Sequence, residues 1–129
     1  MDEIHVKHLD AALAALTNIE GLPAKERDCA DDIIRAGFDT AVVINGDVVI
    51  SKESMRIKAK SIARSMSDAE AMKWLSEDPL AAKRVEEFVI SRRGWTGFDL
   101  AALLRDCREY ALVKIVYAAL TSARSVSVK

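Results

Sequence analysis

The stretch that decides the fold is AVVINGDVVI at residues 41–50, in which two runs of β-branched residues flank Asn45 and Gly46. Asn and Gly both accept the positive φ that a type I′ turn requires. This turn also matches the right-handed twist of paired strands, so the stretch predicts an antiparallel β-hairpin with a two-residue loop.

Pairing across this turn divides the hairpin side chains between two faces, and both faces are apolar. One face carries Val42, Ile44, Asp47 and Val49, and the other carries Ala41, Val43, Val48 and Ile50. A hairpin that lies on a core with one wet face would alternate between apolar and polar residues. An isolated hairpin is also marginal in water. We therefore expect it to be sandwiched between helices, or to pair with a strand of another chain and form one sheet across a dimer.

On both sides of the hairpin the apolar residues recur at helical spacing. Two helices are expected before it and four after it, over about 3–19, 24–36, 51–66, 68–75, 79–93 and 97–122. Gly37 is expected to close the second helix as its C′ residue. The chain is thus predicted to be α+β and predominantly α-helical, with five or six helices and one β-hairpin between the second and third.

Local signals mark several of the helix ends. Ser67 to Glu70 fits a capping box, Asp78-Pro79 fits an N-cap and N1 pair, and Thr96 is expected to cap the last helix. We expect one compact domain over residues 1–121, with the hairpin at about 40–51, and a frayed tail over 122–129.

The composition excludes several classes of protein. Of 129 residues, half are hydrophobic and 30% are charged, with a net charge of −1, which excludes an intrinsically disordered chain and argues against a general polyanion binder. The first residues are acidic and do not resemble a signal peptide. The longest apolar stretch, 110–120, is too short to cross a bilayer. We expect a cytoplasmic protein with no membrane partner.

Motifs for catalysis or cofactor binding are absent from the sequence. It has no GxGxxG, P-loop, HExxH or GxSxG pattern. Cys29 and Cys107 lie far apart without metal-ligand spacing, and we expect both to be reduced, buried thiols. The sequence therefore predicts a protein that is not an enzyme, with no catalytic residues, no cofactor and no metal site. An enzyme of an unfamiliar type stays open as a third class of function, because catalytic residues can come from distant parts of a chain.

The clearest candidate for a binding surface is a row of cations on the third predicted helix. Lys52, Arg56, Lys60 and Arg64 recur every four residues, so they form a ridge along one side. Residues 1–50, in contrast, carry ten acidic and four basic side chains, a net charge of −6. Three interpretations remain open: a solvated face partly neutralised by the second helix, a surface for a protein partner, or contacts to nucleic-acid phosphates.

Two other segments are candidates for interaction. The predicted helix 97–122 is apolar nearly all round, so it is either central to the domain or a partner surface. Residues 68–92 have the length of a helix-turn-helix, with Arg84, Arg92 and Arg93 as candidates to reach DNA, although Glu86 and Glu87 would oppose phosphates.

Together these features favour a non-enzymatic regulatory or inhibitory protein that binds a protein partner as a homodimer. A phage-type inhibitor of a host protein fits this description. The expected oligomer interface consists of Val42, Ile44, Val49, Tyr110, Val113 and Tyr117. The alternative is a DNA-binding transcriptional regulator that uses the basic helix 52–66 or the helix-turn-helix at 68–92.

Overall fold

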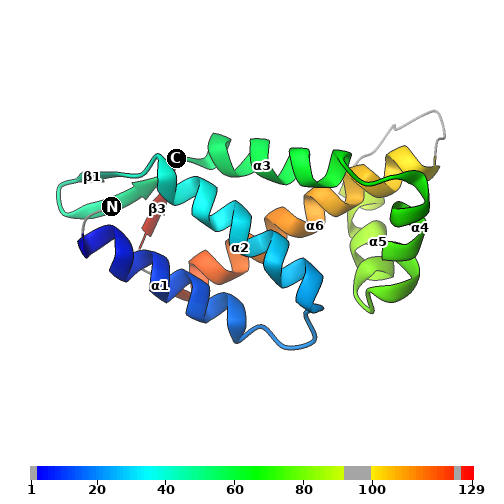
Figure 1. The fold of residues 1–129 in the computed structure, drawn as a ribbon, viewed down its shortest axis with the longest axis horizontal. Coiled ribbons are helices and arrows are strands. Elements are labelled where there is room, and N and C mark those ends of the chain that lie inside the picture. Colours follow the sequence, from blue (N-terminus) through cyan, green and yellow to red (C-terminus); the bar gives the residue numbers. More distant parts are fainter. Residues whose placement is uncertain (1–2, 92–99, 124–125) are drawn as a thin grey trace. The chain divides into compact units, whose positions relative to one another are not determined.

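The computed structural model describes residues 3–91, 100–123 and 126–129. Its elements follow in the order α1 (Glu3–Thr17), α2 (Ala24–Asp39), β1 (Val42–Ile44), β2 (Asp47–Ile50), α3 (Lys52–Arg64), α4 (Asp68–Glu77), α5 (Ala81–Ser91), α6 (Leu100–Ala123) and β3 (Val126–Val128) (Figure 1). The predicted class, mostly helical α+β with a hairpin between the second and third helices, is confirmed.

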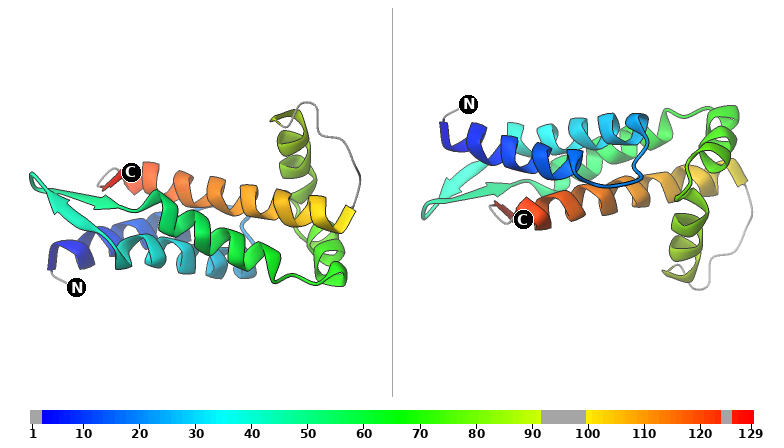
Figure 2. Two further views of the ribbon diagram at one scale, coloured as in Figure 1. Left: turned by 90° about the horizontal axis from the view of Figure 1, so that it is seen from above. Right: turned by 90° about the horizontal axis from the view of Figure 1, so that it is seen from below.

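The hairpin has the predicted turn and register. Asn45 and Gly46 have φ values of 52° and 84°, the two positive angles that a type I′ turn requires. β1 and β2 are antiparallel, with Val43 opposite Val48 and Ile44 opposite Asp47. The tip of the hairpin projects beyond the start of α1 (Figure 2).

The sheet has a third strand that the sequence did not predict. β3 pairs in parallel with β2, with Val48 opposite Val126, so the strand order is β1-β2-β3. The backbone of Lys129 extends the contact, because its N–H donates to Ile50 (3.1 Å) and its carbonyl accepts from Lys52 (2.9 Å). The expectation of a frayed tail is therefore wrong for 126–128, since three residues suffice to complete an edge that another segment provides.

The chain divides into two compact units, the first made of Met1–Ala59 and Leu112–Lys129 and the second of Lys60–Ala111. The expectation of a single domain over 1–121 stays a prediction. In the first unit, α1 and α2 lie side by side (Figure 1). The buried apolar side chains of this unit are Leu9, Ala12, Leu16, Leu22, Ala30, Ile33, Ile34, Phe38, Val48, Ile50, Met55, Ala59, Leu112, Ile115, Val116, Ala119 and Leu120.

Gly37 lies inside α2 and not at its end. The helix continues to Asp39, with Thr40 as its C-cap, so the expectation that Gly37 is the C′ residue is wrong. Gly37 is buried, and a Cβ placed on it would lie 2.7 Å from Cγ of Met55. Glycine is thus required here by the close approach of Met55 and not by a positive φ.

In the second unit, α4 and α5 pack with the first half of α6 around one apolar cluster. Its buried members are Met66, Ala71, Trp74, Ala81, Phe88, Leu103, Leu104, Cys107 and Ala111. α4 begins with the predicted capping box, in which Ser67 and Glu70 each accept from the backbone N–H of the other.

The start of α5 differs from the prediction. Asp78 is the C-cap of α4, and its carboxylate accepts from the N–H of Leu80 (2.9 Å), so it caps the turn into α5, which begins at Ala81. The predicted end of this helix at residue 93 and the predicted cap at Thr96 lie outside the described residues.

Candidate interaction sites

α3 presents its cations to solvent along its whole length. Its buried side is formed by Met55, Ala59 and Ala63, so the opposite side of the helix faces solvent. The exposed cations are Lys52, Arg56, Lys58, Lys60 and Arg64. Successive members of the four-residue series turn by about 40°, so the ridge winds by about 120° from Lys52 to Arg64.

None of these five side chains makes a hydrogen bond or ion pair with any residue that the structure describes. The ion pair of α2 lies within that helix instead, between Arg35 and Asp31 (2.5 Å), and it raises the pKa of Arg35. The interpretation that the second helix partly neutralises the ridge therefore has no ion pair among the described residues to support it. Like charges four residues apart oppose a helix by about 0.2–0.5 kcal/mol per pair, so the ridge slightly destabilises α3.

An apolar side chain lies among these cations. Ile57 is 62% exposed, the largest value among the exposed large hydrophobic residues of the described chain. Its position places it on the same side of α3 as Lys60 and Arg64, three and seven residues further on. The exposed side of α3 is therefore mixed, because one aliphatic side chain lies next to the cations Lys60 and Arg64.

The hairpin forms the second candidate surface. On the face shared by Val43, Val48 and Ile50, the two β2 residues are fully buried. On the other face, Val42 and Ile44 are 52% and 47% exposed. Within the described chain, the helices thus cover one face of the hairpin only, and the sandwich between helices on both faces is not formed.

The edges of the hairpin also differ from each other. β3 occupies the free edge of β2, whereas no described strand pairs with the outer edge of β1. Val42, Val43 and Ile44 are all exposed, and the strand that they form holds no Lys, Pro or other residue that usually protects a sheet edge.

The aromatic residues of α6 that were expected at an oligomer interface occupy different surroundings. Tyr110 belongs to the second unit, where its ring packs against Phe88 with centroids 5.8 Å apart. Val113 and Tyr117 are half-buried in the first unit. An open hollow there is lined by Lys114, Tyr117, Ala118, Thr121 and Ser122. Val42, Ile44 and Val49 are therefore the predicted interface residues that lie together on one face.

The sequence of α6 is apolar on nearly all sides, and the structure shows which of its residues are buried. The helix supplies buried side chains to each of the two units, Leu104 and Cys107 to the second and Leu112 and Val116 to the first. Its nearly continuous apolar surface is thus explained by burial within the chain.

The candidate helix-turn-helix offers fewer cations than its sequence indicates. Arg84 forms an ion pair with Glu87 on the next turn of α5 (3.3 Å), and both side chains are half-buried. Trp74 is buried in the core of this unit. Arg92 and Arg93 lie outside the described residues.

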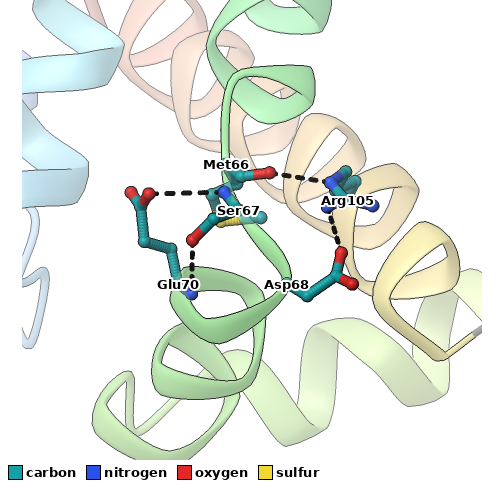
Figure 3. Close-up of polar contacts among 5 residues, drawn as sticks. All are labelled: Met66, Ser67, Asp68, Glu70 and Arg105. Atoms are coloured by element: carbon teal, nitrogen blue, oxygen red, sulfur yellow. Dashed lines mark hydrogen bonds and ion pairs between the residues drawn. The ribbon is translucent and has the colours of Figure 1, made fainter.

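One structural contact of the second unit had no signal in the sequence. Nε of Arg105 donates to the backbone carbonyl of Met66 (2.8 Å), and a second nitrogen of its guanidinium pairs with Asp68 (Figure 3). Arg105 thereby holds the junction between α3 and α4, next to the capping box of Ser67. The partners lie 37 and 39 positions away, so no local pattern could have indicated them.

Within the part of the chain that the structure describes, the thiols and histidines show no grouping for metal binding. Among the residues that the structure describes, no three His, Cys, Asp or Glu side chains are grouped so that they could hold an ion. Cys107 is fully buried, and burial together with the charge of Asp106 raises the pKa of its thiol to about 11. Cys29 is only half-buried, so the expectation that both thiols are buried is wrong for this residue. No described helix has both the length and the apolar character of a membrane span.

Comparison of the chain with protein-family models, with curated proteins and with solved structures found no match. What these candidate sites can do therefore follows from their own geometry and charge.

Proposed function

We propose that this chain is a non-enzymatic regulatory or inhibitory protein that acts in the cytoplasm, as a homodimer, by binding a protein partner. The observation that carries the proposal is the exposed side of α3, where Ile57 lies on the same side as Lys60 and Arg64. These two cations, like the other three of α3, have no partner within the described chain.

The composition of this side suits a protein better than a polyphosphate. Protein interfaces combine an apolar centre with a charged rim, and arginine is enriched in them. Ile57 supplies the apolar group, and Arg56, Lys60 and Arg64 supply the rim. A helix that presents such a side typically enters a groove on its partner. We therefore propose a partner with an acidic groove that holds an apolar pocket for Ile57.

The charge distribution of the chain supports the same interpretation. The chain has a net charge of −1, but residues 1–50 carry −6, so its cations are concentrated elsewhere. Opposed charged patches on two proteins accelerate their encounter and exclude partners of the wrong sign. A ridge that has no partner among the described residues remains available for this purpose.

The test is capture of partners from an extract of the cells that contain the protein. The wild-type protein is compared with Ile57→Asp, with Arg56→Glu/Lys60→Glu, and with Met72→Asp as a control, because Met72 is a 45%-exposed apolar residue on α4. We expect the wild type and the control to retain the same protein and both α3 variants to lose it at least about tenfold. Equal retention by all four proteins would refute the role of α3.

The second candidate function is DNA binding, and the exposed cations of α3 are the observation that favours it. Four phosphate contacts would give a salt slope of about −3.6, so affinity would fall roughly 150-fold between about 50 and 200 mM salt. A mobility shift with random duplex DNA measures this slope. Ile57→Ala separates the two functions, since it removes an apolar anchor from a protein interface but no phosphate contact.

A further inference from the structure

The outer edge of β1, with which no described strand pairs, presents a defined set of backbone groups. In an antiparallel hairpin closed by a two-residue turn, the residues that flank the turn, Ile44 and Asp47, form a hydrogen-bonded pair. Pairs alternate along the ladder, so Val43 opposite Val48 is a non-hydrogen-bonded pair. The N–H and C=O of Val43 consequently point away from β2, toward the free edge.

The backbone groups on either side of Val43 add little to this free edge. The N–H of Ala41 is already donated to the carbonyl of Phe38 (3.1 Å), and the turn begins after Ile44. The edge therefore offers one central residue, Val43, with one residue on each side of it.

We infer that this edge binds the β1 strand of a second copy of the chain, antiparallel and centred on Val43, so that two three-stranded sheets join into one six-stranded sheet. The inference deepens the proposed homodimer and does not depend on the partner of α3. Around a two-fold axis, Val43 faces Val43 of the second copy and the two exchange both of their free hydrogen bonds. At a two-fold axis each residue of β1 lies opposite a residue of the identical strand, so all three residues of β1 are paired.

The side chains also fit this register. Val42 lies opposite Ile44 of the second copy, and Ile44 lies opposite Val42, on the face that the helices leave uncovered. Val49 of β2 lies beside Val42, so a row of side chains runs across the joined sheet from Val49 to Val42 and then to Ile44 of the second copy. The two-fold axis generates a second, identical row. Cross-strand pairs of β-branched residues stabilise a sheet. The exposed apolar residues of two copies thus become neighbours.

The only acidic residue of the hairpin, Asp47, lies away from its equivalent in the second copy. Asp47 adjoins Ile44, so each carboxylate stands at the far end of a row, separated from its equivalent by the two β1 strands. Like charges directly opposite would destabilise the sheet, and this register avoids that contact. A shift by two residues would bring the loop of Asn45 and Gly46 against the strand and lose the central pair.

A second copy suits this edge better than an extended peptide of another protein. Peptides that add to a sheet edge gain affinity from main-chain hydrogen bonds and specificity from pockets for alternate side chains. β1 has three residues and so offers few such hydrogen bonds, but self-pairing uses this short ladder on both chains and closes after two copies. The contact is small, so we expect a dissociation constant on the order of 10 μM.

The first test is sedimentation equilibrium of the wild type, Val43→Pro and Val43→Thr between about 5 and 500 μM. Proline removes the outward N–H, which an edge strand tolerates, while threonine keeps the N–H and the branched shape. We expect the mass of the wild type and of Val43→Thr to rise toward twice 14.2 kDa, and that of Val43→Pro to stay near 14.2 kDa. A wild-type monomer at about 500 μM, a mass that grows beyond a dimer, or a Val43→Pro dimer would each overturn the inference.

The second test is a thiol crosslink, which does not require the strand to be disrupted. In a Cys29→Ser background, Val43→Cys is compared with Val6→Cys, because Val6 is an apolar residue of similar exposure on α1 (43% against 41%). Facing residues of the two-fold pair have Cα atoms about 5.5 Å apart, a separation that a disulfide spans. We expect Val43→Cys to form a covalent dimer at least about tenfold faster. Equal rates would overturn the register, whereas loss of the α3 partner in capture experiments would leave it unaffected.

Discussion

Replacement of Gly37 by alanine tests the packing of α2 against the start of α3. Glycine inside a helix costs about 1 kcal/mol relative to alanine, so in open space this substitution would stabilise the protein. Here the new Cβ would lie 2.7 Å from Cγ and 2.9 Å from Sδ of Met55, and 3.8 Å from Cβ of Ile50. The first two distances are shorter than van der Waals contact, so Met55 must move.

Met55 has little room to do so, because its side chain is only 3% exposed. Forcing one extra methyl group into a packed core costs about 1–3 kcal/mol. Set against a helix gain of about 1 kcal/mol, this predicts that Gly37→Ala lowers the free energy of unfolding by about 1 kcal/mol.

The cause can be isolated in the background of Met55→Ala. This variant removes both atoms that crowd the new Cβ, and by itself it should cost about 2–5 kcal/mol. In its presence Gly37→Ala should become neutral or stabilising by up to about 1 kcal/mol, so the two changes couple by about 1–2 kcal/mol. Urea unfolding followed by circular dichroism measures all four proteins.

A control is available at Gly21, which has a φ of 74° and no atom within 4 Å of the position that a Cβ would take. Gly21→Ala should cost about 1–2 kcal/mol through backbone strain, independently of Met55. If Gly37→Ala stabilises the wild-type protein by the full helix gain and shows no coupling to Met55, the close approach of Met55 is not what requires glycine at this position.

Three further predictions concern the second unit. Arg105→Gln should lower the free energy of unfolding by about 1–2 kcal/mol, because the carbonyl of Met66 loses a charged donor; an unchanged urea midpoint would contradict this. Ser67→Ala should cost about 1 kcal/mol by removing the cap of α4, whereas Ser76→Ala, which removes an exposed hydroxyl within the helix, should cost less than about 0.5 kcal/mol; equal costs would contradict it. The raised pKa of Cys107, about 11 against 9.0 for an ordinary thiol, favours the folded state below pH 9, and this contribution is lost as pH rises toward 11. Unfolding free energies from about pH 8 to 11 should therefore fall more steeply for the wild type than for Cys107→Ala, and parallel curves would refute this.

The sequence by itself determined the elements whose causes are local. The hairpin was predictable because Asn45 and Gly46 supply the two positive φ angles of its turn. The start of α4 was predictable because Ser67 and Glu70 satisfy each other's backbone within four residues. The exposure of the α3 cations also followed from periodicity, since an apolar stripe with Met55 and Ala59 fixes which side of the helix faces solvent.

The candidate sites were predictable only in part, because local pattern does not show which surfaces the rest of the chain covers. Both faces of the hairpin are apolar in sequence, and only the packed structure distinguishes the covered Val48 from the exposed Val42. Tyr110 and Tyr117 look alike on a helical wheel. Their surroundings differ because Phe88 packs on Tyr110, whereas Tyr117 lines an open hollow.

Only the tertiary structure decided the features that join distant segments. β3 exists because β2 presents an unpaired edge to a tail that is too short to signal a strand alone. Gly37 is required by Met55 and not by its own backbone, and Arg105 is held by the carbonyl of Met66 far along the chain. A sequence specifies backbone angles and apolar stripes within a few residues. Which segment pairs with a strand edge, which side chain fills a space in the core and which acceptor binds a buried donor are fixed only when the segments pack together.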